Sequence, residues 1–369
     1  MKKQILLACV ILICFSAHAQ YQTEPAQINN STFMNPIFPG DYPDPSILRD
    51  GDDYYVVHSS FEYYPGLLIW HSRDLINWTL GCQCTAQIRG FGVGAGSGEI
   101  RWTIECFCLE GPKLIKRGEY YYLTVAEGGT SGPPTGHMVI SARSRSPLGP
   151  WENSPYNPIA RAEDRLDRWW SVGHGTLFKA KDESWWMIFH GYEKDHYNMG
   201  RQTLLAPIEW TDDGWYKIPD SIQIDQPIQR PAGQASEQAF SLSDDFSGAI
   251  LRPHWKFFGE YDTDRFQVAN QNLMIKGKGQ SVANSSPLLC VPSHHSYMAQ
   301  VELRITGDAV GGLVLFYNND ACSGILADPN NILANLRGWQ FPTETNVIEN
   351  HAYLRLVNSK QYRRYVLQC

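Results

Sequence analysis

Two carboxylates, each close to a proline, are the residues of this sequence best suited to chemistry. Asp44 lies in the segment YPDPS (42–46), and Glu110 lies about 66 residues later in LEGP (109–112). Because a proline fixes its own φ and pushes the preceding residue toward extended geometry, we expect Asp44, and less directly Glu110, to be held at rigid strand entrances. Rigid carboxylates suit acid and base catalysis. Either tripeptide alone is more typical of an ordinary turn, so the surrounding elements decide.

The elements that position these carboxylates repeat three times along the chain. Each copy has an aromatic-rich alternating strand, a polar turn, a second strand and a charged turn closed by tryptophan. The copies span residues 54–78, 120–151 and 185–215. Strands of this length joined by Gly, Asn and Asp turns, without a long amphipathic helix, predict an all-β protein.

A four-stranded unit repeated at this period is typical of a β-propeller blade, and propellers place their binding site on the central axis. Closed propellers have about 4 to 8 blades. Three recognisable copies therefore predict that further blades are disguised or missing. The Gly-rich segment 82–98 lacks strand patterning, and we expect the irregularity there.

The sequence predicts two domains, as 369 residues usually form. The first is a propeller at residues 30–221, and the Gln/Pro-rich residues 222–243 are typical of a linker. Residues 244–369 contain alternating strands that fit a β-sandwich. This second domain stops within a strand pair, which suggests that it is truncated.

Charge and composition exclude some partners. The formal net charge is −7 and there is no long basic run, which argues against nucleic acid or an anionic membrane surface as the main partner. The chain has 12 Trp and 19 Tyr. Such rings are core residues by default, but they are also what proteins stack on sugar faces.

Residues 1–20 resemble a secretory signal peptide, with two lysines, an apolar stretch and a cleavage site after Ala19. We therefore expect a secreted or periplasmic protein without a membrane span. Seven cysteines remain after cleavage, an odd number. The C-x-C pairs at 82–84 and 106–108 lack the spacer and histidines of zinc sites, so buried or partly disulfide-bonded cysteines are the expectation.

Taken in order, the motifs resemble glycoside hydrolase family 43, the β-xylosidases and α-L-arabinofuranosidases built on a five-bladed propeller. The similar segments are NPI (35–37), GDYPDPS (40–46), SF (60–61), PG (65–66), HSRDL (71–75), EGP (110–112), GHG (173–175) and GRQTL (200–204). The similarity covers about residues 30–220. Residues 244–369 resemble the sandwich often appended to the family's xylosidases.

The resemblance implies that Asp44 is the general base and Glu110 the general acid of an inverting hydrolysis. The family also uses a third carboxylate, an Asp that orients the acid and keeps it protonated. Between the first repeat and Glu110 the only acids are Glu99 and Glu105, and neither lies in the expected motif. A natural short variant would explain this gap, but we favour a deletion or a faulty gene model that removed one to two blades.

The resemblance also implies roles in substrate binding. Phe61 would form a wall of the sugar pocket, and Arg201 would contact sugar hydroxyls or fix the charge of a carboxylate, its alternative being a surface salt bridge. His174 would face the axis and bind water or a calcium ion, its alternative being a structural histidine. Trp70 is a further stacking candidate with a core or rim position as its alternative, and Trp169 and Trp170 rank with it. No cofactor is required.

The leading hypothesis is an exported glycosidase that removes terminal xylose or arabinose from hemicellulose oligosaccharides. The alternative is a catalytically impaired or inactive carbohydrate-binding homologue, in which the aromatic faces persist without a working acid. A third interpretation is an incomplete gene product whose unclosed propeller exposes strand edges.

Overall fold

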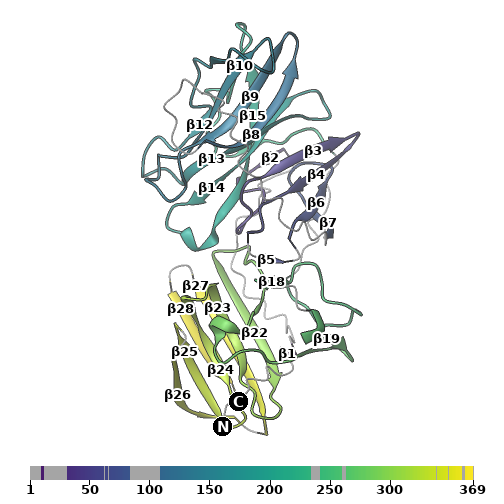
Figure 1. Ribbon diagram of the computed structural model, residues 1–369, viewed down its shortest axis with the longest axis vertical. Helices are drawn as coiled ribbons and strands as arrows, with labels where there is room; N and C mark the ends of the chain where they lie inside the picture. The colour runs from purple at the N-terminus through teal and green to yellow at the C-terminus, as the bar shows by residue number, and fades with distance from the viewer. Residues whose placement is uncertain are drawn as a thin grey trace. The chain divides into compact units, whose positions relative to one another are not determined.

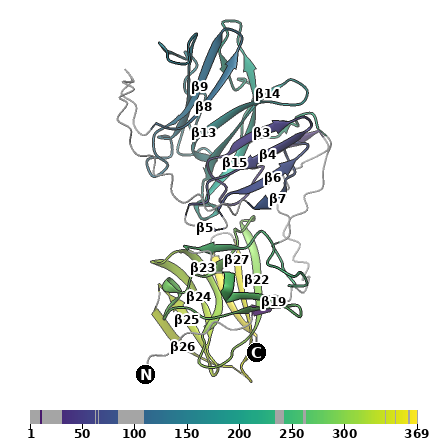
Figure 2. The ribbon, with the colours of Figure 1, turned by 45° about the vertical axis from the view of Figure 1, so that its right-hand side comes forward.

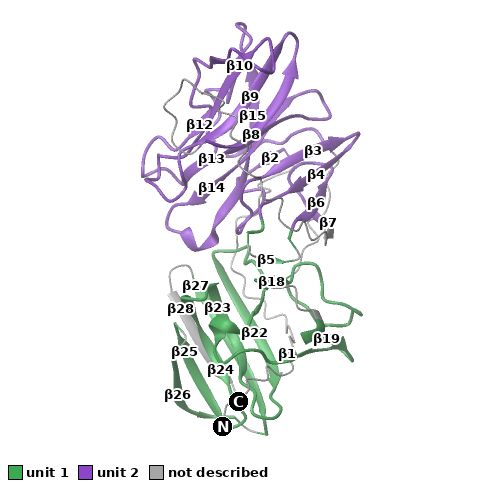
Figure 3. Cartoon of the chain, in the orientation of Figure 1, with its two compact units in different colours: residues 1–23, 60–66, 240–369 green, residues 24–59, 67–239 purple. Residues whose placement is uncertain are grey.

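The computed structural model describes most of the chain, and strands dominate it, which confirms the predicted all-β class. The described residues are 10–11, 31–61, 63–64, 66–83, 109–233, 242–259, 263–337, 339–347, 349–359 and 362–368. The chain divides into two compact units (Figure 3). Unit 1 comprises residues 1–23, 60–66 and 240–369, and unit 2 comprises residues 24–59 and 67–239. No helix in the described residues is long and apolar enough to cross a membrane.

In its described residues, unit 2 contains three antiparallel sheets of strands that pair in chain order (Figures 1 and 2). The first contains β3 (Ser46–Asp50), β4 (Asp53–Val57), β6 (Leu68–Ser72) and β7 (Thr79–Gln83). The second contains β8 (Glu110–Arg117), β9 (Tyr120–Glu127), β10 (Met138–Ser144) and β11 (Glu152–Asn153), with β12 (Ala160–Arg161) also paired to β10. The third contains β13 (Trp169–Lys179), β14 (Trp185–Glu193), β15 (Arg201–Trp210) and β16 (Tyr216–Lys217).

Each predicted sequence copy lies on one of these sheets, so the repeat corresponds to real strand pairs. Each sheet also includes a strand that precedes its copy, namely β3, β8 or β13. Burial alternates along β4 and β6, as expected for strands with one face packed on a core. Aromatic side chains from the second and third sheets share a core that includes Tyr122, Trp169, Phe189 and Trp215.

The segment before β3 runs along the third sheet and closes unit 2 on itself. β2 (Thr32–Phe33) pairs with β17 (Ile228–Gln229), although almost the whole unit separates them in sequence. Residues 228–229 of the predicted linker therefore form a strand of unit 2. Ile228 is 2% exposed, because this isolated apolar residue in a polar stretch fills the core beside β2.

Unit 1 contains two larger sheets and one small sheet in its described residues (Figure 1). The six-stranded sheet has the order β19 (Phe266–Ala269), β20 (Asn272–Ile275), β1 (Val10–Ile11), β22 (Ser296–Arg304), β27 (His351–Ser359) and β28 (Tyr362–Gln368). The four-stranded sheet contains β23 (Gly311–Asn318), β24 (Ala321–Ala327), β25 (Asn331–Leu336) and β26 (Trp339–Asn346). Core residues of the two sheets, such as Val301, Ile325 and Leu354, pack together.

The small sheet of unit 1 includes a segment that the chain contributes from between β4 and β6. Its order is β21 (Leu288–Leu289), β18 (Lys256–Phe258) and β5 (Tyr63–Tyr64). The helical elements of the described residues are the 3-10 helices η1 (Tyr197–Met199), η2 (Thr263–Arg265) and η3 (Val282–Asn284). β1 falls within the predicted signal peptide, so cleavage would remove it from its place between β20 and β22.

Candidate active site

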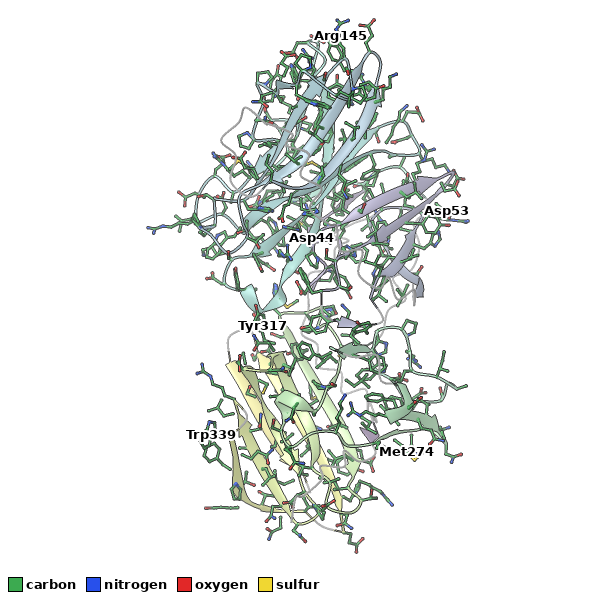
Figure 4. The ribbon with its side chains drawn as sticks, in the orientation of Figure 1. Asp44, Asp53, Arg145, Met274, Tyr317 and Trp339 are labelled. Atoms are coloured by element: carbon green, nitrogen blue, oxygen red, sulfur yellow. The ribbon has the colours of Figure 1, made fainter. Side chains whose placement is uncertain are left out.

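Asp44 lies two residues before β3, at the strand entrance that its prolines predict, but its backbone is not extended. Its φ is +56°, in the left-handed region. Proline disfavours the helical region for the residue before it, and left-handed geometry is uncommon outside glycine, although Asp tolerates it better than most residues. The extended geometry expected from the sequence is therefore wrong, because tertiary contacts override the local preference. Figure 4 shows the Asp44 side chain within unit 2.

These contacts hold the loop that carries Asp44 from several directions. Hydrogen bonds reach each residue of 42–45 from the loop after β4 and from all three long strands of the third sheet. They are Tyr42 N to Arg201 O (3.0 Å), Thr203 Oγ1 to Tyr42 O (2.7 Å), Ser59 N to Pro43 O (3.1 Å), Asp44 N to His190 Nδ1 (3.1 Å) and Thr176 Oγ1 to Pro45 O (2.8 Å). A strained backbone persists where its surroundings overdetermine it, and such strain clusters at functional sites.

The carboxylate of Asp44 meets three side chains of the third sheet. Its Oδ1 lies 2.8 Å from Arg201 Nη1, 3.3 Å from His174 Nδ1 and 3.3 Å from His190 Nδ1. Burial raises the pKa of Asp44, but the positive charge of Arg201 outweighs burial and holds the pKa well below its usual range. Asp44 is therefore ionised at any pH at which the protein would work, while its side chain stays 13% exposed.

Three histidines, His137, His174 and His190, gather around this carboxylate. Burial lowers the pKa of each, and lowers that of His190 to about 3, so all three imidazoles are neutral at pH 7. The rings of His137 and His190 stack with centroids 5.3 Å apart and an interplanar angle of 11°. The ring of His174 lies 5.7 Å from that of His190.

His174 occupies an irregular part of β13 that directs its ring toward the carboxylate. The pairing of β13 with β14 shifts register on both sides of Gly173, and His174 has a φ of +57°. β-bulges of this kind re-aim side chains. The flanking glycines are required by space, since a Cβ on Gly173 would lie 2.1 Å from the ring of His137 and one on Gly175 2.8 Å from Met187 Sδ.

Glu110 begins β8, as its motif predicts. The next residue, Gly111, lies directly against the ring of His174. Gly111 has a φ of +58°, and a Cβ added to it would lie 2.5 Å from His174 Nε2. One imidazole therefore faces Asp44 with its Nδ1 edge and the backbone of Gly111 with its Nε2 edge. The negative charges of Asp44 and Glu110 both act on His174. The two predicted catalytic carboxylates thus belong to one electrostatic cluster, in which Glu110 is exposed.

Lys113, also on β8, belongs to this cluster although the sequence analysis does not single it out. Its Nζ donates a hydrogen bond to Ser46 Oγ at 3.2 Å, which ties β8 to the first residue of β3. Burial lowers the pKa of Lys113, while the negative charge of Asp44 opposes this shift. The lysine therefore adds a second cation on the side of Asp44 that faces the second sheet.

The remaining candidates lie elsewhere. Trp70 is 3% exposed and packs edge to face against Phe38 and Tyr42, so it has the core position that the sequence left as its alternative. Phe61 belongs to unit 1 and is 60% exposed, and its role as a pocket wall stays a prediction. Glu99 and Glu105 lie outside the described residues, as do three of the four C-x-C cysteines.

Sequence reasoning misses His137 and His190 for a physical reason. His190 closes the apolar run of β14, and His137 precedes the alternating run of β10, so each resembles an ordinary strand residue. Their signal is burial, which a single sequence does not display. Both are 0% exposed, and a fully buried histidine needs a reason to be there.

The side chains near His174 offer few of the oxygen ligands that the predicted calcium ion would need. Calcium takes about 6 to 8 oxygen ligands. The described neighbours of His174 include one close carboxylate, Asp44, which Arg201 already neutralises. Among the described residues no group of three or more His, Cys, Asp or Glu is arranged to hold a metal ion. The ion stays a prediction, and no step below uses it.

Comparison with known families adds independent information. The model of the glycosyl hydrolases family 43 matches residues 33–93 and 93–216, which contain Asp44, Glu110, His174 and Arg201. A non-reducing end α-L-arabinofuranosidase of Bacteroides ovatus is 27% identical over 69% of this chain and 67% of its own length. A xylan 1,3-β-xylosidase of a Vibrio species is 26% identical over 50% of this chain. The chain covers 57% of that relative, less than two thirds of its length.

Solved structures show the same fold. The GH43 protein BlXynB from Bacillus licheniformis superposes with a TM-score of 0.79 at 23% identity, covering 92% of this chain and 88% of that one. A xylan β-1,4-xylosidase from Bacillus halodurans gives a TM-score of 0.78 at 21% identity, covering 91% of this chain and 89% of the other. Both matches cover most of this chain.

Proposed function

Because the chain belongs to glycosyl hydrolase family 43, we propose that it is a glycosidase that removes terminal xylose or arabinose from hemicellulose oligosaccharides. The observation that carries this proposal is the constrained, ionised carboxylate of Asp44, gathered with Glu110 around one neutral imidazole. Relatives named as arabinofuranosidase and xylosidase support both sugars.

Asp44 acts as the general base. The closest contacts that Arg201, His174 and His190 make with its carboxylate all involve Oδ1. Oδ2 is therefore the oxygen that accepts a proton from the attacking water. The depressed pKa of Asp44 keeps the carboxylate ready to do so, and the rigid loop fixes its direction toward the sugar.

Glu110 acts as the general acid and protonates the leaving oxygen on the opposite face of the sugar. Inverting cleavage needs about 6.5–9.5 Å between the two carboxyl groups, which leaves room for the water. The placement of Glu110 at the start of β8 and of Asp44 before β3, on two different sheets, supports such a separation. The exposure of Glu110 gives it access to a substrate.

Arg201 and His174 border the site and contribute to substrate binding. Their side chains are 12% and 14% exposed, so each combines a fixed position with a small accessible surface. Two roles were expected for Arg201, namely contact with sugar hydroxyls and control of a carboxylate's charge. Its ion pair with Asp44 supports the second role. Trp70 would act indirectly, because its ring packs against Tyr42 in the loop that carries Asp44.

We extend the proposal to architecture and location. The three sheets of unit 2 are blades of an incomplete propeller of the five-bladed type, and the two large sheets of unit 1 form a sandwich. The apolar N-terminal stretch directs export, which brings the enzyme to hemicellulose fragments.

Hydrolysis of aryl β-xyloside and aryl α-L-arabinofuranoside tests the proposal. The wild-type chain is compared with Asp44→Asn and Glu110→Gln, which keep the side-chain shapes. Turnover by the wild type that falls at least about 1,000-fold in Asp44→Asn supports catalysis by this site. Proton NMR of the first sugar released shows the inverted anomer if the mechanism is right. Xylo-oligosaccharide binding with no turnover above the two variants would instead favour the inactive carbohydrate-binding homologue.

A further inference from the structure

His190 is a fully buried ionisable group beside Asp44, and the proposed chemistry does not use it. Its side chain is 0% exposed at the centre of the third sheet, on β14. Within the described part of the chain its Nε2 has no hydrogen-bond partner. An unsatisfied buried polar atom is unfavourable, so we expect the other ring nitrogen of His190 to make a hydrogen bond that offsets this cost.

That other nitrogen, Nδ1, lies 3.1 Å from the backbone nitrogen of Asp44 in hydrogen-bonding geometry. A backbone N–H can only donate, so Nδ1 must be the acceptor and the ring proton of the neutral imidazole must be on Nε2. With no proton on Nδ1, His190 has nothing to donate to the carboxylate oxygen that lies 3.3 Å away. His190 therefore contacts the reacting residue through its backbone and leaves the carboxylate to Arg201.

The backbone of Asp44 needs such a partner more than most. The residue combines a φ of +56° with a proline on either side, so no neighbouring N–H can share in holding it. The other bonds to the loop end on Tyr42, Pro43 and Pro45. Among the described residues, the bond to His190 is the one that acts on the backbone of Asp44.

His190 is in turn held in place by His137. The two rings stack in parallel, and His137 Nδ1 donates to the carbonyl of Gly128. The ring of His137 also lies so close to the backbone of Gly173 that no side chain would fit on that glycine. His190 thus has a fixed ring plane and cannot turn its acceptor away from Asp44.

We propose that His190 is a positioning residue, which fixes the left-handed backbone of Asp44 as a neutral hydrogen-bond acceptor and thereby aims the catalytic base. His137 supports it by stacking. The inference rests on the proposed function because it takes Asp44 as the general base, and it adds a role for His190 in orienting that base.

Two substitutions separate the acceptor from the ring. His190→Phe keeps a flat ring beside His137 but removes the acceptor, whereas His190→Asn removes the ring but places an amide oxygen near the position of Nδ1. We expect His190→Phe to lower kcat on aryl β-xyloside at least about tenfold with KM within about twofold, and His190→Asn to stay within about threefold of the wild type. Equal kcat values for the two variants would overturn the proposal.

The pH profile tests whether His190 is a neutral acceptor. Among the described residues, the charged or titratable groups facing Asp44 are Arg201 on β15, His174 on β13, His190 on β14, Lys113 on β8 and His137 before β10. Because an unprotonated Nδ1 donates nothing to the carboxylate, His190→Phe should lower kcat without moving the acid limb of kcat/KM, and a moved limb would overturn the assignment. His254→Phe replaces a buried histidine of unit 1 that is 5% exposed, and it should leave both kcat and the limb unchanged.

A measurement without turnover keeps the inference separate from the proposed function. Nitrogen-15 NMR of the wild-type protein should show Nδ1 of His190 without a proton and Nε2 with one at pH 7. A protonated Nδ1 would overturn the positioning role even in an active enzyme. A wild type with no turnover above Asp44→Asn would overturn the function, while the NMR result would still decide how His190 and Asp44 are bonded.

Discussion

Arg201 and Asp44 meet at 2.8 Å although 157 residues separate them in the chain. The arginine contacts the loop twice, since its guanidinium binds the carboxylate and its carbonyl accepts the N–H of Tyr42. Its own N–H donates to Asp41 Oδ1 at 3.0 Å. One residue of β15 therefore sets both the position of the proposed base and its charge.

Arg201→Met should lower kcat/KM at least about 100-fold, equivalent to about 2.7 kcal/mol, because it leaves a buried carboxylate without its cation. Arg201→Lys keeps the charge but not the planar fork, so its loss should be intermediate. Steady-state kinetics at pH 7 measure both. Arg145→Met is the control, since this arginine is 69% exposed and pairs with Glu119 at the surface. Wild-type kinetics in Arg201→Met would contradict the role.

The buried histidines should make the fold sensitive to mild acid. The pKa of His190 is lowered to about 3 in the folded state, whereas an unfolded histidine titrates near 6.5, so the unfolded chain takes up the proton first. Stability is complete above about pH 6.5 and is lost as the pH falls toward 3, by up to about 1.4 kcal/mol per pH unit for this residue. His137 and His174 shift in the same direction.

Urea unfolding between pH 7.5 and 5.5 measures this effect, because ordinary carboxylates, with pKa values of about 3.9 to 4.3, stay ionised across that window. His190→Asn should flatten the dependence of unfolding free energy on pH. His71→Asn, at a histidine that is 32% exposed and bonded to Asp53, should retain the wild-type slope of the buried cluster. An unfolding free energy that stays constant across the window would refute the neutral, buried state of the three rings.

Gly111→Ala should damage the site through His174. The added Cβ would lie 2.5 Å from His174 Nε2, so the ring must leave its present position beside Asp44. The substitution also strains a backbone at φ +58°, which costs about 1–2 kcal/mol whatever the contact. Gly118→Ala carries the same strain at φ +60° with nothing within 4 Å of its Cβ.

The comparison of these two alanine variants isolates the contact. Both should lower the melting temperature, but kcat/KM should fall at least about tenfold only in Gly111→Ala. Similar kinetics in the two variants would show that the ring of His174 has no bearing on catalysis.

Asn35→Ala should destabilise unit 2 by about 2–4 kcal/mol. The side chain is 1% exposed and makes three hydrogen bonds, donating to the carbonyls of Leu205 and Ile224 and accepting from the N–H of Leu205. Its loss leaves those backbone groups unpaired in the core. Chemical denaturation measures the change, with the exposed Asn153→Ala on β11 as a control expected within about 0.5 kcal/mol of the wild type. A neutral Asn35→Ala would mean that water replaces the three bonds.

The sequence predicts the strands and strand entrances, because both depend on local patterns of residue types. Alternating aromatic residues give the strands of all three sheets, and the prolines around Asp44 and beside Glu110 mark strand entrances that the structure confirms. The order of the known motifs also predicts that His174 and Arg201 lie near Asp44, as the structure shows.

What the sequence does not predict arises from contacts between distant segments. The left-handed backbone of Asp44 opposes its local preference and depends on β14 and β15. His137 and His190 acquire their roles only when two sheets bring their rings together. Ile228 looks like part of a linker because its partner strand, β2, is almost the whole unit away.

The pairing of β2 with β17 also has a consequence for biosynthesis. The strand at Thr32–Phe33 is made first, but its partner at Ile228–Gln229 leaves the ribosome only after every other described strand of unit 2. Completion of the unit must therefore wait until nearly all of it has been translated. During that interval the incomplete unit exposes strand edges and apolar surface, and chaperones can bind the nascent chain.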